Sequence, residues 1–171
     1  MAGTTSAPVS ARQQYLNALE RETATTFKVL RAYPADKGEL RPHEKTKTAR
    51  ELSFVFALEM GLAQAVLTNT LEMPPSLPPV PDTIAECISA FEAGLGNLRA
   101  LIEGMSDDDL YNGAVKFLVG PKTMGDIPKL DFLWFMLHDM IHHRGQFSIY
   151  LRMADGKVPS IYGPSADEPW Y

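Results

Sequence analysis

The chain has 171 residues, with 16 Lys and Arg against 21 Asp and Glu and a net charge of −5. Because phosphate affinity comes from clustered Lys and Arg, this acidic balance argues against a nucleic-acid partner. A hydrophobic content of 45% and a charged content of 22% are typical of one globular domain with a substantial core.

A single cysteine, Cys87, excludes an internal disulfide. The longest apolar-rich run, residues 127–140, is interrupted by charged residues and is too short to cross a membrane. We therefore expect a cytoplasmic protein without a membrane partner.

Four segments carry apolar residues at three- and four-residue steps, as amphipathic helices do, and strand alternation is nearly absent. The predicted helices are residues 9–32, 49–71, 82–104 and 128–154. Thr48 with Glu51, and Thr83 with Glu86, have the spacing of capping boxes at the starts of the second and third helices. Between these two helices, the proline-rich residues 74–81 predict an extended connection.

The stretch before the last helix is predicted to be mostly irregular. Ser106 has the character of a cap at the start of a short helix. Residues 111–125 show no helical period, and Gly120-Pro121 predicts a turn within them. Asp126 is the predicted N-cap of the last helix.

Together these elements predict an all-α fold, a four-helix bundle that forms a single domain over residues 1–171. Residues 1–8 and 164–171 are predicted to be flexible or extended tails. The last helix is apolar around most of its circumference, so we expect one side to face the core and another a homodimer interface. Arg144 and Arg152 on this helix are predicted to form structural ion pairs, with anion binding as the alternative.

Three of the four histidines lie on the last predicted helix. His138 and His142 are four residues apart, which places both imidazoles on one helical face, where they can share a divalent ion. The alternative is that both are ordinary core or interface histidines. His143 points about 100° away from His142, so we expect it to be exposed or to support a site from behind.

Glu59 is a carboxylate within the apolar stripe of the second predicted helix. Its burial is costly unless it is paired or bound to metal. Either it lies at the edge of the stripe and reaches water, or it meets the histidine pair from the facing helix. In the second case His138, His142 and Glu59 form a metal site with an open position for water.

The run LHDMIHHRGQ at residues 137–146 resembles the C-terminal half of the DinB/YfiT superfamily, and so do residues 150–153 and 158–168. Residues 48–52 are similar to the start of the second helix in that family. The resemblance spans most of the chain. It implies a four-helix bundle of up-down-down-up order, often dimeric, and in many members a nickel or zinc ion held by three histidines.

Two of the three family histidines match His138 and His142, whereas the first falls at Val55, which cannot ligate a metal. Glu59 lies one turn further along the same face and could substitute for it. Some relatives are thiol-dependent S-transferases or hydrolases.

The resemblance thus implies a DinB-like protein of uncharacterised activity. Its expected activity is that of a divalent-metal-dependent hydrolase or thiol S-transferase with an incomplete histidine triad and a small-molecule or thiol substrate. The alternative is a non-catalytic bundle that has lost its metal and binds a small molecule or a protein partner.

Overall fold

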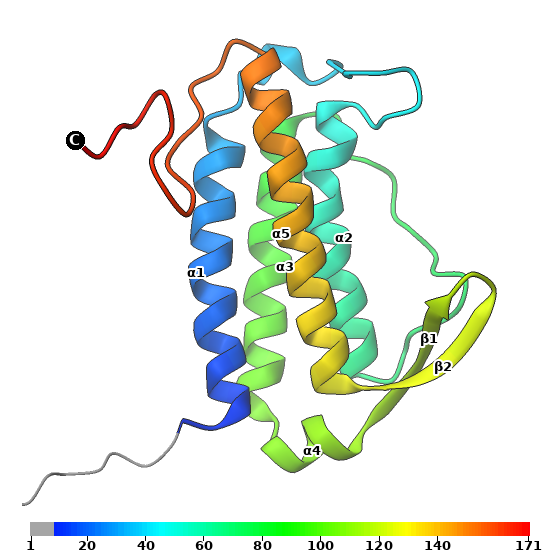
Figure 1. The fold of residues 1–171 in the computed structure, drawn as a ribbon. Helices are drawn as coiled ribbons and strands as arrows, with labels where there is room; N and C mark the ends of the chain where they lie inside the picture. Colours follow the sequence, from blue (N-terminus) through cyan, green and yellow to red (C-terminus); the bar gives the residue numbers. More distant parts are fainter. Residues whose placement is uncertain (1–8) are drawn as a thin grey trace, which may run out of the picture.

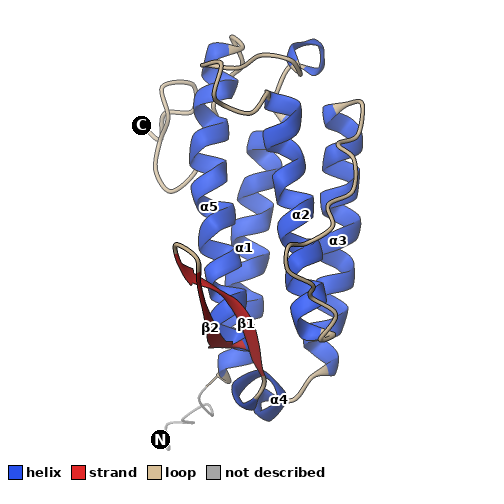
Figure 2. Ribbon diagram, turned by 90° about the vertical axis from the view of Figure 1, so that its right-hand side faces the viewer, coloured by secondary structure: helices blue, strands red, loops and turns tan. Residues whose placement is uncertain are grey.

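Four long helices lie side by side in this computed structural model, which describes residues 9–171, and a small hairpin projects near one end (Figures 1 and 2). The described elements are, in chain order, α1 (Ala11–Arg31), the 3-10 helix η1 (Ala35–Lys37), α2 (Ala49–Leu67), α3 (Ile84–Gly104), α4 (Asp107–Asn112), β1 (Ala114–Gly120), β2 (Thr123–Pro128) and α5 (Lys129–Met153). The prediction of a mainly helical protein is confirmed.

Side-chain caps fix where α2 and α3 begin. Thr48 Oγ1 accepts a hydrogen bond from the Glu51 backbone N–H at 3.1 Å, and the Glu51 carboxylate accepts one from the Thr48 N–H at 2.7 Å. Thr83 and Glu86 form the same reciprocal pair at α3. Both predicted capping boxes are confirmed, because each satisfies backbone donors that the helix itself leaves unpaired.

The end of α2 differs from the prediction. The helix stops at Leu67 and not at residue 71. The Thr68 hydroxyl donates to the Gln64 carbonyl oxygen at 2.9 Å, and Asn69 follows with a φ of 56°. Asn tolerates this left-handed conformation better than most residues, so the chain leaves the helix here.

The predicted irregular stretch contains an antiparallel hairpin, so the expectation of no regular structure there is wrong. Val115 lies opposite Ile127, and the Phe117 ring packs edge-on against the Phe132 ring of α5 with centroids 4.9 Å apart. The sequence of β2 hides the strand because Gly125 and Asp126 are residue types depleted from strands. Packing of β1 on α5 stabilises the pair in spite of them.

Asp126 is therefore a strand residue, and its prediction as an N-cap is wrong. Its carboxylate pairs with Lys116 Nζ across the hairpin at 3.0 Å. Pro128 occupies the N-cap position of α5 without a side-chain cap. The predicted turn at Gly120-Pro121 is confirmed, and Lys122 completes it with a φ of 58°.

The helix α5 packs against both α1 and α2 (Figure 1). Phe56 of α2, Phe91 of α3 and Phe147 of α5 are fully buried, and their rings meet in the core. A different face of α5 remains exposed and carries three large apolar side chains, Phe135, Ile149 and Met153. The other described elements of the chain thus cover only part of the apolar surface of α5.

A buried ionic network joins α5 to α1 and to the C-terminal segment. The Arg144 guanidinium pairs with the Glu22 carboxylate at 2.8 Å, donates to the Glu22 carbonyl oxygen at 3.0 Å and donates to the Tyr162 hydroxyl. Tyr162 in turn donates to the Glu22 carboxylate at 2.6 Å. Arg152 pairs with Asp167, so both arginines form the predicted structural ion pairs.

The end of the chain runs without helix or strand beside α1 (Figure 1). Residues 164–171 bend at residues 166–168, and hydrogen bonds hold them to the preceding loop, including one from the Ser160 N–H to the Glu168 carboxylate at 2.7 Å. The predicted tail at residues 1–8 lies outside the described residues.

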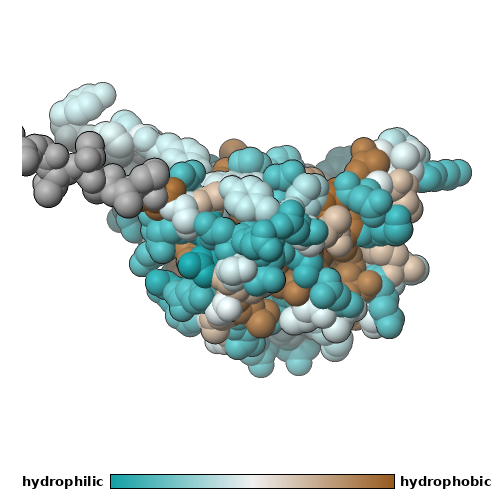
Figure 3. All heavy atoms as spheres, turned by 90° about the horizontal axis from the view of Figure 1, so that it is seen from below, coloured by the Kyte–Doolittle hydropathy of each residue, from teal (hydrophilic) through white to brown (hydrophobic). Residues whose placement is uncertain are grey.

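The end of the molecule that carries α4 is mostly hydrophilic, with hydrophobic patches on the side where the hairpin projects (Figure 3). Leu118, Val119 and Met124 are the exposed large apolar residues of the hairpin. Within residues 9–171, none of the helices combines the length and apolar character needed to cross a membrane.

Candidate metal centre

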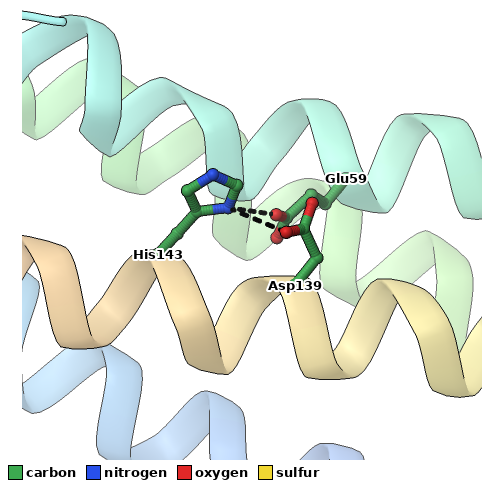
Figure 4. Close-up of side chains that lie close together, drawn as sticks. All are labelled: Glu59, Asp139 and His143. Carbon is green, nitrogen blue, oxygen red and sulfur yellow. Dashed lines mark hydrogen bonds and ion pairs between the residues drawn. The ribbon is translucent and has the colours of Figure 1, made fainter. Parts of the chain in front are cut away.

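Three side chains that can ligate a metal meet between α2 and α5 (Figure 4). Asp139 and His143 are one helical turn apart on α5, and Glu59 faces them from α2. His143 Nδ1 lies 2.7 Å from Glu59 Oε1 and 3.9 Å from Asp139 Oδ1. One ligand atom from each of the three lies within 4.8 Å of the other two. A single ion can therefore be reached by all three residues.

Glu59 is the most buried of the three, with 2% of its surface exposed. Of the two sequence-based alternatives, the structure rules out a carboxylate that reaches water at the edge of the stripe. One oxygen pairs with His143, whereas Oε2 has no hydrogen-bond partner in the described part of the chain. A buried carboxylate oxygen without a partner is costly, so this position has an unmet need for a proton or a cation.

Burial governs the proton affinity of the site. Loss of hydration raises the pKa of Glu59 to about 7, the hydrogen bond and positive charge of His143 oppose this shift, and the nearby Asp139 carboxylate adds to it. The pKa of His143 is raised, chiefly by its hydrogen bond to Glu59. Near neutral pH the pair therefore competes for a proton that a metal ion can displace.

His138 and His142 share a helical face, as their spacing predicts, but that face of α5 is exposed. The His142 ring is 2.8 Å from the Gln146 amide nitrogen, and the His138 ring lies beside Trp134 with centroids 6.1 Å apart. The group that the described residues bring together with Glu59 contains neither histidine.

His143 is the imidazole that contacts Glu59, and the expectation that it is exposed is wrong, since only 17% of its side chain is accessible. Two features of the sequence could have predicted that His143 faces the protein interior. Asp139 and His143 have the same four-residue spacing as the pair that was favoured. His143 also lies seven residues from both Met136 and Tyr150, which are buried.

Val55, the position matched to the first family histidine, is half-buried and packs against the core. Glu59 lies one helical turn beyond it on α2. The structure thus shifts the candidate site by one turn on α2 and by one residue on α5, relative to the positions that the resemblance implies.

A surface cleft of about 470 Å³ opens beside His143. Its lining residues come from the loop before α2, from α2 and from α5: Pro42, Lys45, Thr46, Lys47, Leu52, His143, Gln146, Ile149 and Tyr150. The buried Tyr150 hydroxyl donates to the Lys47 carbonyl oxygen at 2.9 Å, which fixes the loop against α5. His143 therefore lies between the buried Glu59 carboxylate and an open cleft large enough for a small molecule.

Comparison with known proteins finds similarity to one protein family. The model of the DinB family matches residues 121–170, which include α5 with Asp139 and His143. Over these residues the chain is similar to the DinB family. It is similar to the uncharacterised protein YrdA of Bacillus subtilis, with 26% identity over 156 residues, which cover 90% of this chain and 89% of the relative.

Solved DinB-like structures share the fold. A DinB-like protein of Bacillus cereus superposes with a TM-score of 0.71 at 19% identity, covering 86% of this chain and 95% of its own. A DinB-like protein of Bacillus subtilis gives a TM-score of 0.65 at 13% identity, covering 92% and 99%. The predicted resemblance to the DinB/YfiT superfamily is confirmed, and at these identities the structures speak for the fold alone.

Proposed function

We propose that this DinB-like protein binds one divalent metal ion through Glu59, Asp139 and His143 and uses it in catalysis. The observation that carries the proposal is Glu59 Oε2, a buried carboxylate oxygen without a partner that faces an aspartate and a histidine. A cation at this point supplies the missing partner and offsets the burial of negative charge. The donor set therefore fits a metal.

The chemistry of the donors bears on which metal binds. Imidazole nitrogen suits zinc, nickel and iron, whereas carboxylate oxygen suits harder ions such as manganese and magnesium. Two carboxylates with one imidazole make a more oxygen-rich set than the three histidines implied by the resemblance. We therefore favour zinc over nickel, with manganese as its main competitor.

The proposed activity is that of a metal-dependent hydrolase or thiol S-transferase. A bound divalent ion would act as a Lewis acid that lowers the pKa of a water molecule or thiol. His143 borders the cleft, so its ring positions the site toward an incoming substrate. Glu59 and Asp139 would supply the negative charge that holds the ion, and the burial of Glu59 keeps water away from its carboxylate.

The decisive experiment measures metal content in protein purified without a metal-affinity tag and then incubated with zinc, manganese or nickel. We expect about one ion per chain. His143→Gln should abolish binding, and His142→Gln, a matched change at the adjacent residue, should leave it intact. Binding lost with His138 or His142 and retained without His143 would refute the proposed ligand set.

A second candidate function has one observation in its favour. His143 Nδ1 already lies 2.7 Å from Glu59 Oε1, which is the distance of a complete charge-assisted hydrogen bond. A non-catalytic protein that has lost its metal and binds a small molecule or protein partner could keep this pair for stability. The absence of any bound ion after the incubations above would favour this candidate.

We also propose the finer architecture implied by the resemblance, a single four-helix-bundle domain of up-down-down-up order. Supporting it, residues 68–83 run without helix along the side of α2 and α3, which allows these consecutive helices to point the same way (Figure 2). Proteolysis should then release no stable fragment smaller than residues 9–171.

We propose that the protein is cytoplasmic and that it assembles as a homodimer. The homodimer is supported by the exposed side chains of Phe135 and Met153 on one face of α5, since covering such side chains removes apolar surface from water. Sedimentation of the parent and of a Phe135→Glu variant tests it. We expect a dimer for the parent and a monomer for the variant.

A further inference from the structure

The cleft beside His143 has a charge opposite to that of the protein. We call it the lysine cleft, and its lining residues are those given above, from Pro42 to Tyr150. Lys45 and Lys47 are its ammonium groups, and none of the described residues that line it carries a carboxylate. In a chain with a net charge of −5, this is a local region of positive charge.

The two lysines are free to act on a ligand. Both are exposed, and neither forms an ion pair within residues 9–171. The loop that carries them is held in place, because the Tyr150 hydroxyl bonds the Lys47 carbonyl oxygen. A loop that is already ordered loses less conformational freedom when a ligand binds.

The remaining walls of the lysine cleft are largely apolar. Pro42, Leu52 and Ile149 line it together with the Tyr150 ring, and Ile149 is exposed. A ligand that fits both kinds of wall has a charged group at one end and an apolar body at the other. Water-sized inorganic anions would leave the apolar walls unused.

The net charge of the candidate metal centre also indicates that the lysines attract an anionic ligand. Two carboxylates and a neutral imidazole cancel the charge of a divalent ion, so the filled centre has no net charge with which to attract an anion. Lys45 and Lys47 supply that attraction from the cleft. The positive charge that recruits a ligand and the site that acts on it are thus separate groups.

We propose that the lysine cleft binds a small organic anion, with its charged group at Lys45 and Lys47 and its apolar body against Leu52 and Ile149. This deepens the proposed function, on which it rests for the reaction that follows binding, by naming the substrate class. The binding step itself depends on the cleft residues and is testable without metal.

The test titrates the full-length protein, freed of metal with a chelator, with phenylacetate and with the uncharged phenylacetamide, which has a similar shape. Amide NMR signals report the site. We expect phenylacetate to bind at least tenfold more tightly and to shift the signals of residues 43–47 and 143–150. The double variant Lys45→Gln/Lys47→Gln should weaken phenylacetate binding at least fivefold.

The charge-matched control is Lys28→Gln/Lys122→Gln, which removes two exposed lysines from α1 and from the hairpin turn. It should bind phenylacetate as the parent does. Equal affinity for the acid and the amide, equal loss in both double variants, or inorganic phosphate binding as tightly as phenylacetate would overturn the inference.

Zinc binding measured on the same samples separates this inference from the proposed function. Zinc bound without lysine-dependent binding of phenylacetate overturns the anion cleft and leaves the metal centre in place. Lysine-dependent binding of phenylacetate by a protein that binds none of zinc, manganese and nickel supports the cleft and overturns the metal centre.

Discussion

His143 and Arg144 are consecutive residues of α5 whose polar groups face different neighbours, α2 and α1 respectively. Arg144 faces α1, where the Glu22 carboxylate and the Tyr162 hydroxyl satisfy its guanidinium. His143 faces α2, where it satisfies one oxygen of Glu59 and leaves the other without a partner. The first network is complete, and the second is not.

This difference separates a structural site from a site for a ligand. A buried charge whose partners are all present stabilises the fold only while it stays intact. A buried carboxylate that lacks a partner lowers the stability of the fold. Such a group is typical of a functional site, where a bound ligand supplies the missing partner. The predictions below test whether the two sides of α5 divide in this way.

The largest effect is expected on the Arg144 side. Arg144→Met should lower the free energy of unfolding by about 3–5 kcal/mol, because it leaves the Glu22 carboxylate without its cation. Urea denaturation measures the loss. Arg152→Met removes a more exposed pair with Asp167 and should cost less than about 1 kcal/mol. Equal losses in the two variants would show that burial of the Arg144 network contributes nothing.

On the Glu59 side, stability should depend on metal. Zinc at a concentration 100 times its dissociation constant should raise the free energy of unfolding by about 2.7 kcal/mol. Glu59→Gln should remove this gain while the metal-free protein remains folded. Asp131→Asn, at an exposed carboxylate of α5, is the control and should keep the gain. A zinc effect that survives Glu59→Gln contradicts the proposed site.

The same side should make the metal-free protein less stable as pH rises. Because burial raises the pKa of Glu59 from 4.5 to about 7, the folded state binds this proton more tightly than the unfolded state. The contribution is fully present below pH 4.5 and is lost as pH rises through 7. We expect a loss of about 2–3 kcal/mol between pH 5 and pH 8. Urea denaturation at each pH should show a flatter profile for Glu59→Gln, and identical profiles would be incompatible with a buried, protonated Glu59.

The smallest effect sharpens the comparison. Tyr162→Phe removes the hydroxyl that bridges Arg144 and Glu22 and should cost about 1 kcal/mol in the free energy of unfolding. Zinc affinity, measured by calorimetry, should not change, since this hydroxyl lies on the other side of α5. A parallel loss of zinc affinity would mean that the two sides are coupled.

Local signals in the sequence predicted the helices well. Thr48 and Thr83 mark the starts of α2 and α3 because a capping box depends on residues only three apart. The hairpin was missed because β2 contains Gly125 and Asp126, and its pairing depends on β1 and on the surface of α5. Stabilisation by packing between distant segments cannot be predicted from the residues of one strand alone.

The candidate site was predicted in part. Glu59 stood out as a carboxylate in an apolar stripe, and its burial bears out that suspicion. The partner histidine could not be chosen by spacing, because His138 with His142 and Asp139 with His143 have the same four-residue separation. The two pairs are distinguished by the rotation of α5 about its axis, which is set by packing against α1 and α2 and decides which pair faces α2.

The adjacency of His143 and Arg144 has a consequence for the rotation of α5. Successive residues of a helix are separated by about 100° around its axis. Any turn of α5 that withdraws His143 from Glu59 also carries the Arg144 guanidinium away from Glu22. The rotation of α5 that brings Asp139 and His143 to Glu59 is therefore held from the side facing α1, so residues outside the candidate site help to set its geometry.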